Sequence, residues 1–137
     1  ARTQRAMTLA ARLTALQAAG LPRLEAQQLL LLALGRDPHD RAWLTAHDDQ
    51  TLDANASTRL DALLARHRAG EPMAYLRGEQ AFFGLPLRVD RRVLAPRPDT
   101  ETLVQWALDV LAERPPAARV IDLGTGSGAI ALALKHQ

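Results

Sequence analysis

The sequence predicts an α-helical bundle domain at the amino terminus, then a β-hairpin linker, and then the start of an α/β, Rossmann-like domain. Three observations lead to this prediction. Leucines recur at helical spacing over residues 1–70, the Tyr and both Phe fall within residues 71–98, and a glycine-rich stretch follows an apolar run within residues 99–137. We expect the domains and the linker to occupy these three ranges.

Four helices are predicted in the first range, because apolar residues recur every three or four positions and Gly or Pro interrupts the pattern between them. Their expected bounds are residues 3–19, 22–35, 39–46 and 54–67. The second helix is apolar almost all round, so we expect it in the middle of the bundle. The third helix is expected to bury Trp43 and Leu44.

The linker begins near residue 71, where the composition changes. Gly84 and the alternation of Leu85, Leu87 and Val89 predict a β-hairpin. Three aromatic residues are expected in the core at the domain junction: Tyr75, Phe82 and Phe83. After the hairpin, two prolines at 96 and 98 predict an extended arm.

The third range predicts a helix, a strand and a second helix. Asp99 is placed to cap the first helix, whose buried stripe would hold Leu103, Val104, Ala107, Val110 and Leu111, with Trp106 also in the core. The two prolines at 115 and 116 end that helix. A strand is expected at 119–123, followed by a helix from about Gly128.

Composition excludes several classes of function. The chain has no Cys, so disulfides, thiolate zinc sites and a Cys nucleophile are excluded. Its four His show no spacing suited to a metal, and its formal charge of +2 comes without a dense basic block, so we expect neither a metal site nor direct nucleic-acid binding. No apolar run reaches the ~18 residues of a membrane span, and we expect an untargeted, soluble, cytoplasmic protein.

The glycine stretch VIDLGTGSGAIA has the pattern of a strand, a loop and a helix that together bind a nucleotide-like ligand. A Walker loop needs Lys followed by Ser or Thr after its last glycine, but Ala129 and Ile130 follow Gly128 here. A dinucleotide fingerprint places its third glycine three residues beyond the second, whereas Gly128 lies two beyond Gly126. A glycine turn that only packs the helix on the strand is the other alternative.

The remaining pattern, an acidic residue followed by Gly-x-Gly-x-Gly, resembles the first motif of class I S-adenosyl-L-methionine-dependent methyltransferases. The resemblance implies that the cofactor is bound by Asp122, Gly124, Thr125, Gly126, Ser127 and Gly128. We expect Asp122 to orient the loop through backbone amides rather than to act as a base.

The residues upstream make the resemblance more specific. An ordered series resembles the release factor glutamine methyltransferases, the HemK/PrmC family: Gly70-Glu71-Pro72, Tyr75-Leu76-x-Gly78, Phe82 or Phe83 then Gly84, Val89, and Leu94-Ala95-Pro96-Arg97-Pro98-Asp99-Thr100-Glu101. A related family methylates a glutamine of a ribosomal protein and remains the alternative. The sequence Pro98-Asp99-Thr100-Glu101 favours the release-factor branch.

This resemblance implies transfer of a methyl group from S-adenosyl-L-methionine to the glutamine nitrogen in the Gly-Gly-Gln motif of class 1 peptide-release factors. It implies a monomeric enzyme whose helical domain recognises that substrate, and whose segment at Arg97, Thr100 and Glu101 lines the methionine end of the cofactor. A rigid proline arm with a helix cap is the alternative for that segment. The family's Asn-Pro-Pro-Tyr motif and ribose-binding acidic residue are absent. We therefore expect an amino-terminal fragment, inactive alone, and a stand-alone helical binding module is the alternative.

Overall fold

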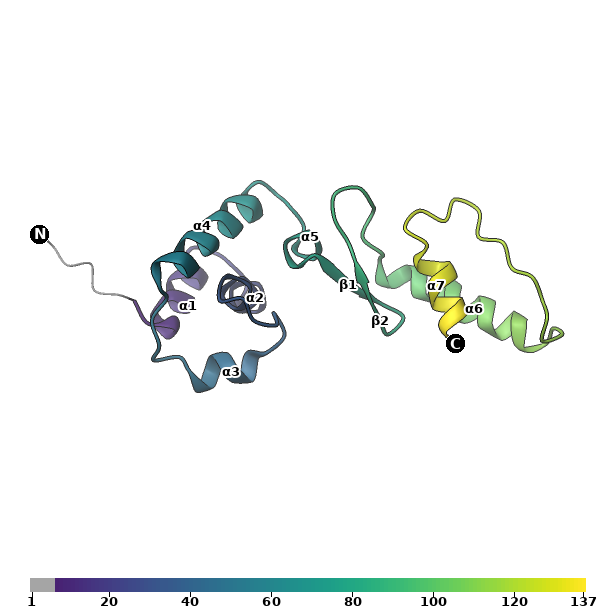
Figure 1. The fold of residues 1–137 in the computed structure, drawn as a ribbon, viewed down its shortest axis with the longest axis horizontal. Helices are drawn as coiled ribbons and strands as arrows, with labels where there is room; N and C mark the ends of the chain where they lie inside the picture. Colours follow the sequence, from purple (N-terminus) through teal and green to yellow (C-terminus); the bar gives the residue numbers. More distant parts are fainter. Residues whose placement is uncertain (1–6) are drawn as a thin grey trace, which may run out of the picture. The chain divides into compact units, whose positions relative to one another are not determined.

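Figure 1 shows a computed structural model of the chain, which describes residues 7–137. Contacts between residues divide the chain into two compact units, one ending at Leu76 and the other beginning at Arg77. Each unit has its own buried core and is described separately.

The first unit is helical. It contains α1 (Leu9–Ala18), α2 (Arg23–Ala33), α3 (Arg41–Ala46), α4 (Ala54–Arg68) and the short α5 (Met73–Arg77), whose last residue opens the second unit. The four predicted helices are confirmed, and the ends of the last three are shifted by at most two residues. The first was predicted from residue 3 and begins at Leu9, and the predicted residues 3–6 lie outside the described range. Side-chain oxygens of Thr8, Asp40 and Asp53 cap α1, α3 and α4 by accepting backbone N–H groups of the first turn.

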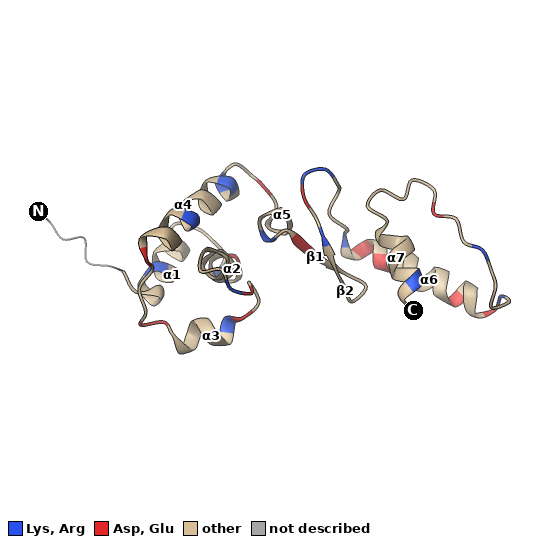
Figure 2. Ribbon diagram, viewed as in Figure 1, with Lys and Arg blue, Asp and Glu red and all other residues tan. Residues whose placement is uncertain are grey.

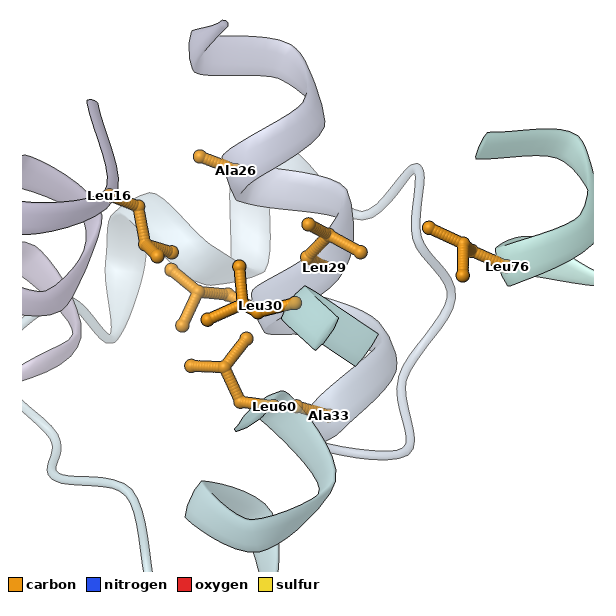
Figure 3. Close-up of a cluster of buried hydrophobic side chains, with 8 residues drawn as sticks. Leu16, Ala26, Leu29, Leu30, Ala33, Leu60 and Leu76 are labelled. Carbon is orange, nitrogen blue, oxygen red and sulfur yellow. The ribbon is translucent and has the colours of Figure 1, made fainter. Parts of the chain in front are cut away.

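The second helix, α2, lies at the centre of this unit and contacts α1, α3 and α4. Most of its length is buried, as its continuous apolar sequence predicts. Figure 3 shows Leu30 of α2 and Leu60 of α4 pointing toward one another in a cluster of buried side chains. Both side chains are 0% exposed, so they carry a large share of the hydrophobic stabilisation of the unit.

A smaller cluster of Leu9, Leu31 and Leu44 holds α3 against α2. Leu44 is buried as expected, but Trp43 is only half-buried. Its ring stacks on that of His47, with centroids 4.4 Å apart, and the guanidinium of Arg36 lies 3.9 Å from the ring centroid. Trp43 thus contacts both this cluster and two polar side chains, so the prediction that the helix buries Trp43 was only partly right.

The second unit begins with the predicted β-hairpin. Strand β1 (Glu79–Phe82) pairs antiparallel with β2 (Leu85–Arg88), and Phe82 lies opposite Leu85. The two-residue turn has positive φ at both positions, +47° at Phe83 and +77° at Gly84, which is the backbone of a type I′ turn. The hairpin therefore has the tightest connection that two antiparallel strands adopt.

After the hairpin come a short 3₁₀ helix at Pro98–Thr100, then α6 (Glu101–Ala112) and α7 (Ala129–His136). Phe82, Val104, Ala129 and Ala133 form the buried core, so the hairpin, α6 and α7 pack together. Three predictions for α6 were wrong. Asp99 lies inside the 3₁₀ helix and does not cap α6. Trp106 is 66% exposed, and two residues of the predicted buried stripe, Leu103 and Val110, are 46% and 40% exposed.

The strand predicted at 119–123 does not form. This segment has no regular secondary structure, and Ile121 and Leu123 are 82% and 89% exposed. Strands require a neighbour for their backbone hydrogen bonds, and the hairpin is the only sheet within residues 7–137. The structure thus has a helical domain followed by a small hairpin, and the Rossmann-like start remains a prediction.

Within the described part of the chain, no helix combines the length and the hydropathy needed to span a bilayer.

Candidate functional site

The glycine loop lines one wall of a hollow of about 420 Å³ in the second unit. The opposite wall is the arm between the hairpin and α6, and Phe82 and the start of α7 complete the lining. Four of the predicted site residues lie together in this hollow: Gly124, Thr125, Gly126 and Ser127. The structure therefore brings together two segments that are about thirty residues apart and that were singled out separately in the sequence.

The backbone of the loop has the conformation that its glycines allow. Gly124, Gly126 and Gly128 have φ of +69°, +56° and +82°, values that side chains with a Cβ rarely adopt. Gly128 is the N-cap residue of α7 and does not itself line the hollow. The first amides of α7 have no partner within the helix, and they lie at the end of the loop. A polar or anionic group placed there meets backbone donors rather than side chains.

The opposite wall supplies two guanidinium groups, Arg92 and Arg97. Arg92 is already paired with Asp90, and its Nε lies 3.0 and 3.1 Å from the two carboxylate oxygens. Hydrogen bonds from the side chain and the backbone of Arg92 lower the pKa of Asp90 to about 2. Arg97 forms no ion pair with the described acidic residues, so it is the guanidinium that remains available to a ligand.

Thr100 and Glu101 have different surroundings. Thr100 lines the hollow, whereas Glu101 does not. The Oε1 atom of Glu101 accepts a hydrogen bond from the backbone N–H of Phe83, at 2.8 Å. Glu101 thus holds the hairpin turn.

Asp122 is not in this hollow. It lines a second one of about 480 Å³, together with Pro115, Pro116 and residues of α7. Its Oδ2 atom is buried and has no hydrogen-bond partner among residues 7–137. The expected contact with the loop amides is therefore absent for this oxygen. An orphaned buried carboxylate oxygen is costly, and its position next to the glycine loop leaves it available to a further donor.

Sequence reasoning missed Arg92 and Val93, which line the hollow beside the predicted segment that begins at Leu94. A weak signal was present, because an Asp side chain often accepts the backbone N–H two residues further on, as Asp90 does from Arg92. The described residues contain no group of three or more metal-ligating side chains.

Comparison with known proteins assigns the chain to a family. The PrmC N-terminal domain matches residues 8–78, which is more than half of the chain. This chain belongs to the PrmC family. The matched range covers α1 to α5, so the helical unit of this PrmC chain is the domain that the family defines.

Named relatives of the PrmC chain are bacterial release factor glutamine methyltransferases. The chain is 47% identical to that of Haemophilus influenzae, 51% to that of Bordetella pertussis and 48% to that of Escherichia coli. The matches cover 84%, 84% and 89% of this chain and 40%, 41% and 42% of the relatives. The chain thus spans about two fifths of the length of these relatives, and the family resemblance stated from the sequence is confirmed.

Proposed function

We propose that the glycine-loop hollow is part of the S-adenosyl-L-methionine site of a protein-glutamine methyltransferase. Its substrate would be the glutamine of the Gly-Gly-Gln motif in class 1 peptide-release factors. One observation carries the proposal: the glycine loop and the arm around Arg97 line the same hollow. The names of the relatives favour the release-factor branch over the ribosomal-protein alternative.

The residues around the hollow fit this cofactor. Backbone amides after Gly128 suit a polar or anionic group, and the unpaired guanidinium of Arg97 suits a carboxylate. Leu94, at 76% exposure, and Ile130 offer apolar surface in the same hollow. When bound, S-adenosyl-L-methionine would supply an electrophilic methyl group. The chain's own contribution would be to bind and orient that molecule, with Gly124, Thr125, Gly126, Ser127 and Gly128 in the loop and Asp122 just before it in the sequence.

The other part of the catalytic apparatus is not within these 137 residues. An amide nitrogen is a poor nucleophile, and the family's Asn-Pro-Pro-Tyr motif, which positions it, does not occur in the sequence. We therefore propose that the 137-residue chain alone does not transfer a methyl group. In the whole enzyme, the helical unit would recognise the release factor, and the protein would act as a monomer in the cytoplasm without binding nucleic acid directly.

Nuclear magnetic resonance on the isotope-labelled chain tests the cofactor site. Addition of S-adenosyl-L-methionine is expected to shift the amide signals of Gly124, Gly126 and Gly128, whereas NAD at the same concentration leaves them in place. Arg97→Gln is expected to weaken the affinity for S-adenosyl-L-methionine, measured from these shifts, about tenfold, because one charge-assisted hydrogen bond is lost. Arg114→Gln makes the same charge change outside the hollow and serves as the control.

Two results would count against the proposal. If only NAD shifts the loop amides, the loop binds a dinucleotide. If S-adenosyl-L-methionine shifts no amide of the loop, the loop only packs the helix. A separate assay with tritiated cofactor and a purified class 1 release factor tests the activity of the chain itself. Label on the release factor would refute the proposed inactivity.

A further inference from the structure

A second hollow lies entirely within the helical unit, between the start of α2 and α3. We call it the α2–α3 hollow. It is open to solvent, has a volume of about 690 Å³, and is lined by Arg23, Leu24, Gln27, His39, Asp40, Arg41, Ala42 and Thr45. Neither the glycine loop nor the arm contributes to it, so the cofactor site leaves it unexplained.

Gln27 is the unusual member of this lining. Its side chain is polar, yet the residue is only 7% exposed, and the amide forms no hydrogen bond with the described residues. It also lines a smaller adjoining hollow of about 210 Å³, which shares Arg23 and Thr45. Buried polar groups almost always have a partner. The amide atoms of Gln27 are not among the fully buried atoms that lack a partner, so they are reached from the open side of the hollow, where a ligand group can replace solvent.

The charged groups of the hollow differ in what they are free to bind. Asp40 is engaged, because it accepts the Trp43 N–H and forms an ion pair with Arg36 at 3.5 Å. Arg23 and Arg41 form no ion pair with described acidic residues. The hollow thus presents two available guanidinium groups.

The chemistry of the hollow favours a peptide over other anions. The Gln27 amide has both a donor and an acceptor, which matches a peptide bond. Leu24, at 49% exposure, offers apolar contact beside the guanidinium groups. Figure 2 shows acidic segments in the loops at both ends of α3, and Asp48 lines the adjoining hollow. These acidic groups would repel a continuous polyanion such as RNA. A peptide can bring a single carboxylate to the guanidinium groups and keep its other residues away from the acidic ones.

We propose that the α2–α3 hollow binds an acidic peptide segment of a protein partner. A carboxylate of the segment pairs with Arg23 and Arg41, its backbone satisfies Gln27, and an apolar side chain covers Leu24. The site requires only the helical unit, so its occupancy is independent of the cofactor site and of methyl transfer.

The test uses the whole chain and a short, end-blocked fluorescent peptide in which glutamate alternates with leucine. Fluorescence anisotropy is expected to show binding that weakens about tenfold for Arg23→Gln and for Arg41→Gln. Gln27→Leu is expected to weaken it about fivefold, and this variant still folds because an apolar side chain replaces an amide that has no partner. Arg68→Gln carries the same charge change outside the hollow and is expected to bind like the parent chain.

Three results would overturn the proposal. One is no binding of the acidic peptide, and another is equal binding of a peptide with glutamine in place of glutamate. The third is tighter binding of single-stranded RNA than of the acidic peptide, with RNA affinity falling equally in Arg68→Gln and in Arg41→Gln. Circular dichroism of each variant shows that the helices remain, which separates loss of the site from loss of the fold.

Discussion

The Oε1 atom of Glu101 lies 2.8 Å from the backbone nitrogen of Phe83, and this hydrogen bond joins the hairpin turn to the start of α6. Phe83 has a φ of +47°, which is strained for a residue with a side chain. Its ring packs against the core of the second unit. The carboxylate and the ring contact together hold the turn in a conformation that Phe disfavours.

Glu101→Ala is expected to destabilise the second unit by about 2 kcal/mol, because a hydrogen bond to a charged acceptor is lost. Amide hydrogen exchange should then accelerate at Phe83 in particular. Glu113→Ala removes the same side chain from the other end of α6 and should leave exchange at Phe83 unchanged. Equal protection of the Phe83 amide in both variants would mean that the turn is stable without the hydrogen bond to Glu101.

Leu30→Ala is expected to destabilise the helical unit by about 3 kcal/mol, since Leu30 is 0% exposed and its loss leaves a cavity. Leu24→Ala, on the same helix at 49% exposure, should cost less than about 0.5 kcal/mol. Urea unfolding followed by the fluorescence of Trp43, in a Trp106→Phe background, reports this unit alone. Similar urea midpoints for Leu30→Ala and Leu24→Ala would contradict the burial of Leu30 in the core of the unit.

Gly126→Ala should cost about 1 kcal/mol of stability, because φ is +56° and no atom lies within 4 Å of the added Cβ. Gly20→Ala is the matched control, with φ of +99°, the same open surroundings and a place in the helical unit. Thermal unfolding should show similar losses for both. Only Gly126→Ala is expected to weaken the binding of S-adenosyl-L-methionine in the amide-shift titration. Equal weakening by Gly20→Ala would mean that the loop does not bind the cofactor.

Asp90 should titrate far below a free aspartate. Folding lowers its pKa from 3.8 to about 2, first through the side-chain hydrogen bonds of Arg92 and then through its backbone N–H. A lowered pKa means that the pair stabilises the fold fully above pH ~4 and that this contribution disappears as the pH falls through about 2.

Carboxyl-carbon resonances followed against pH measure this midpoint directly. In Arg92→Gln the midpoint of Asp90 should move up toward its ordinary value of 3.8, whereas Arg88→Gln should leave it low. An unchanged midpoint in Arg92→Gln would show that the turn backbone, rather than the guanidinium, stabilises the carboxylate.

The elements that could be predicted from the sequence are those stabilised by nearby residues. Leucine spacing predicts α2 and α4, and the alternation around Gly84 predicts the hairpin. Each of these patterns lies within one short stretch of sequence. The segment 119–123 has an equally clear apolar pattern. It forms no strand because a parallel strand depends on partners elsewhere in a sheet, and local sequence does not report whether they are present.

The candidate site divides in the same way. The glycine loop could be recognised from its spacing, and the arm at Arg97 from its prolines. Their common hollow could not, because it depends on how the hairpin, α6 and α7 pack. The burial of Gln27 also escaped notice, since a glutamine inside a leucine-rich helix looks like a surface residue.

The core around α2 draws its buried side chains from residues 16 to 76 and none from the second unit. During synthesis, the helical unit therefore has every contact it needs once Leu76 has left the ribosome. Domains that emerge first generally fold first. This unit should thus be able to bury its leucines while the glycine loop is still being translated, which limits the time that its apolar surface is open to aggregation.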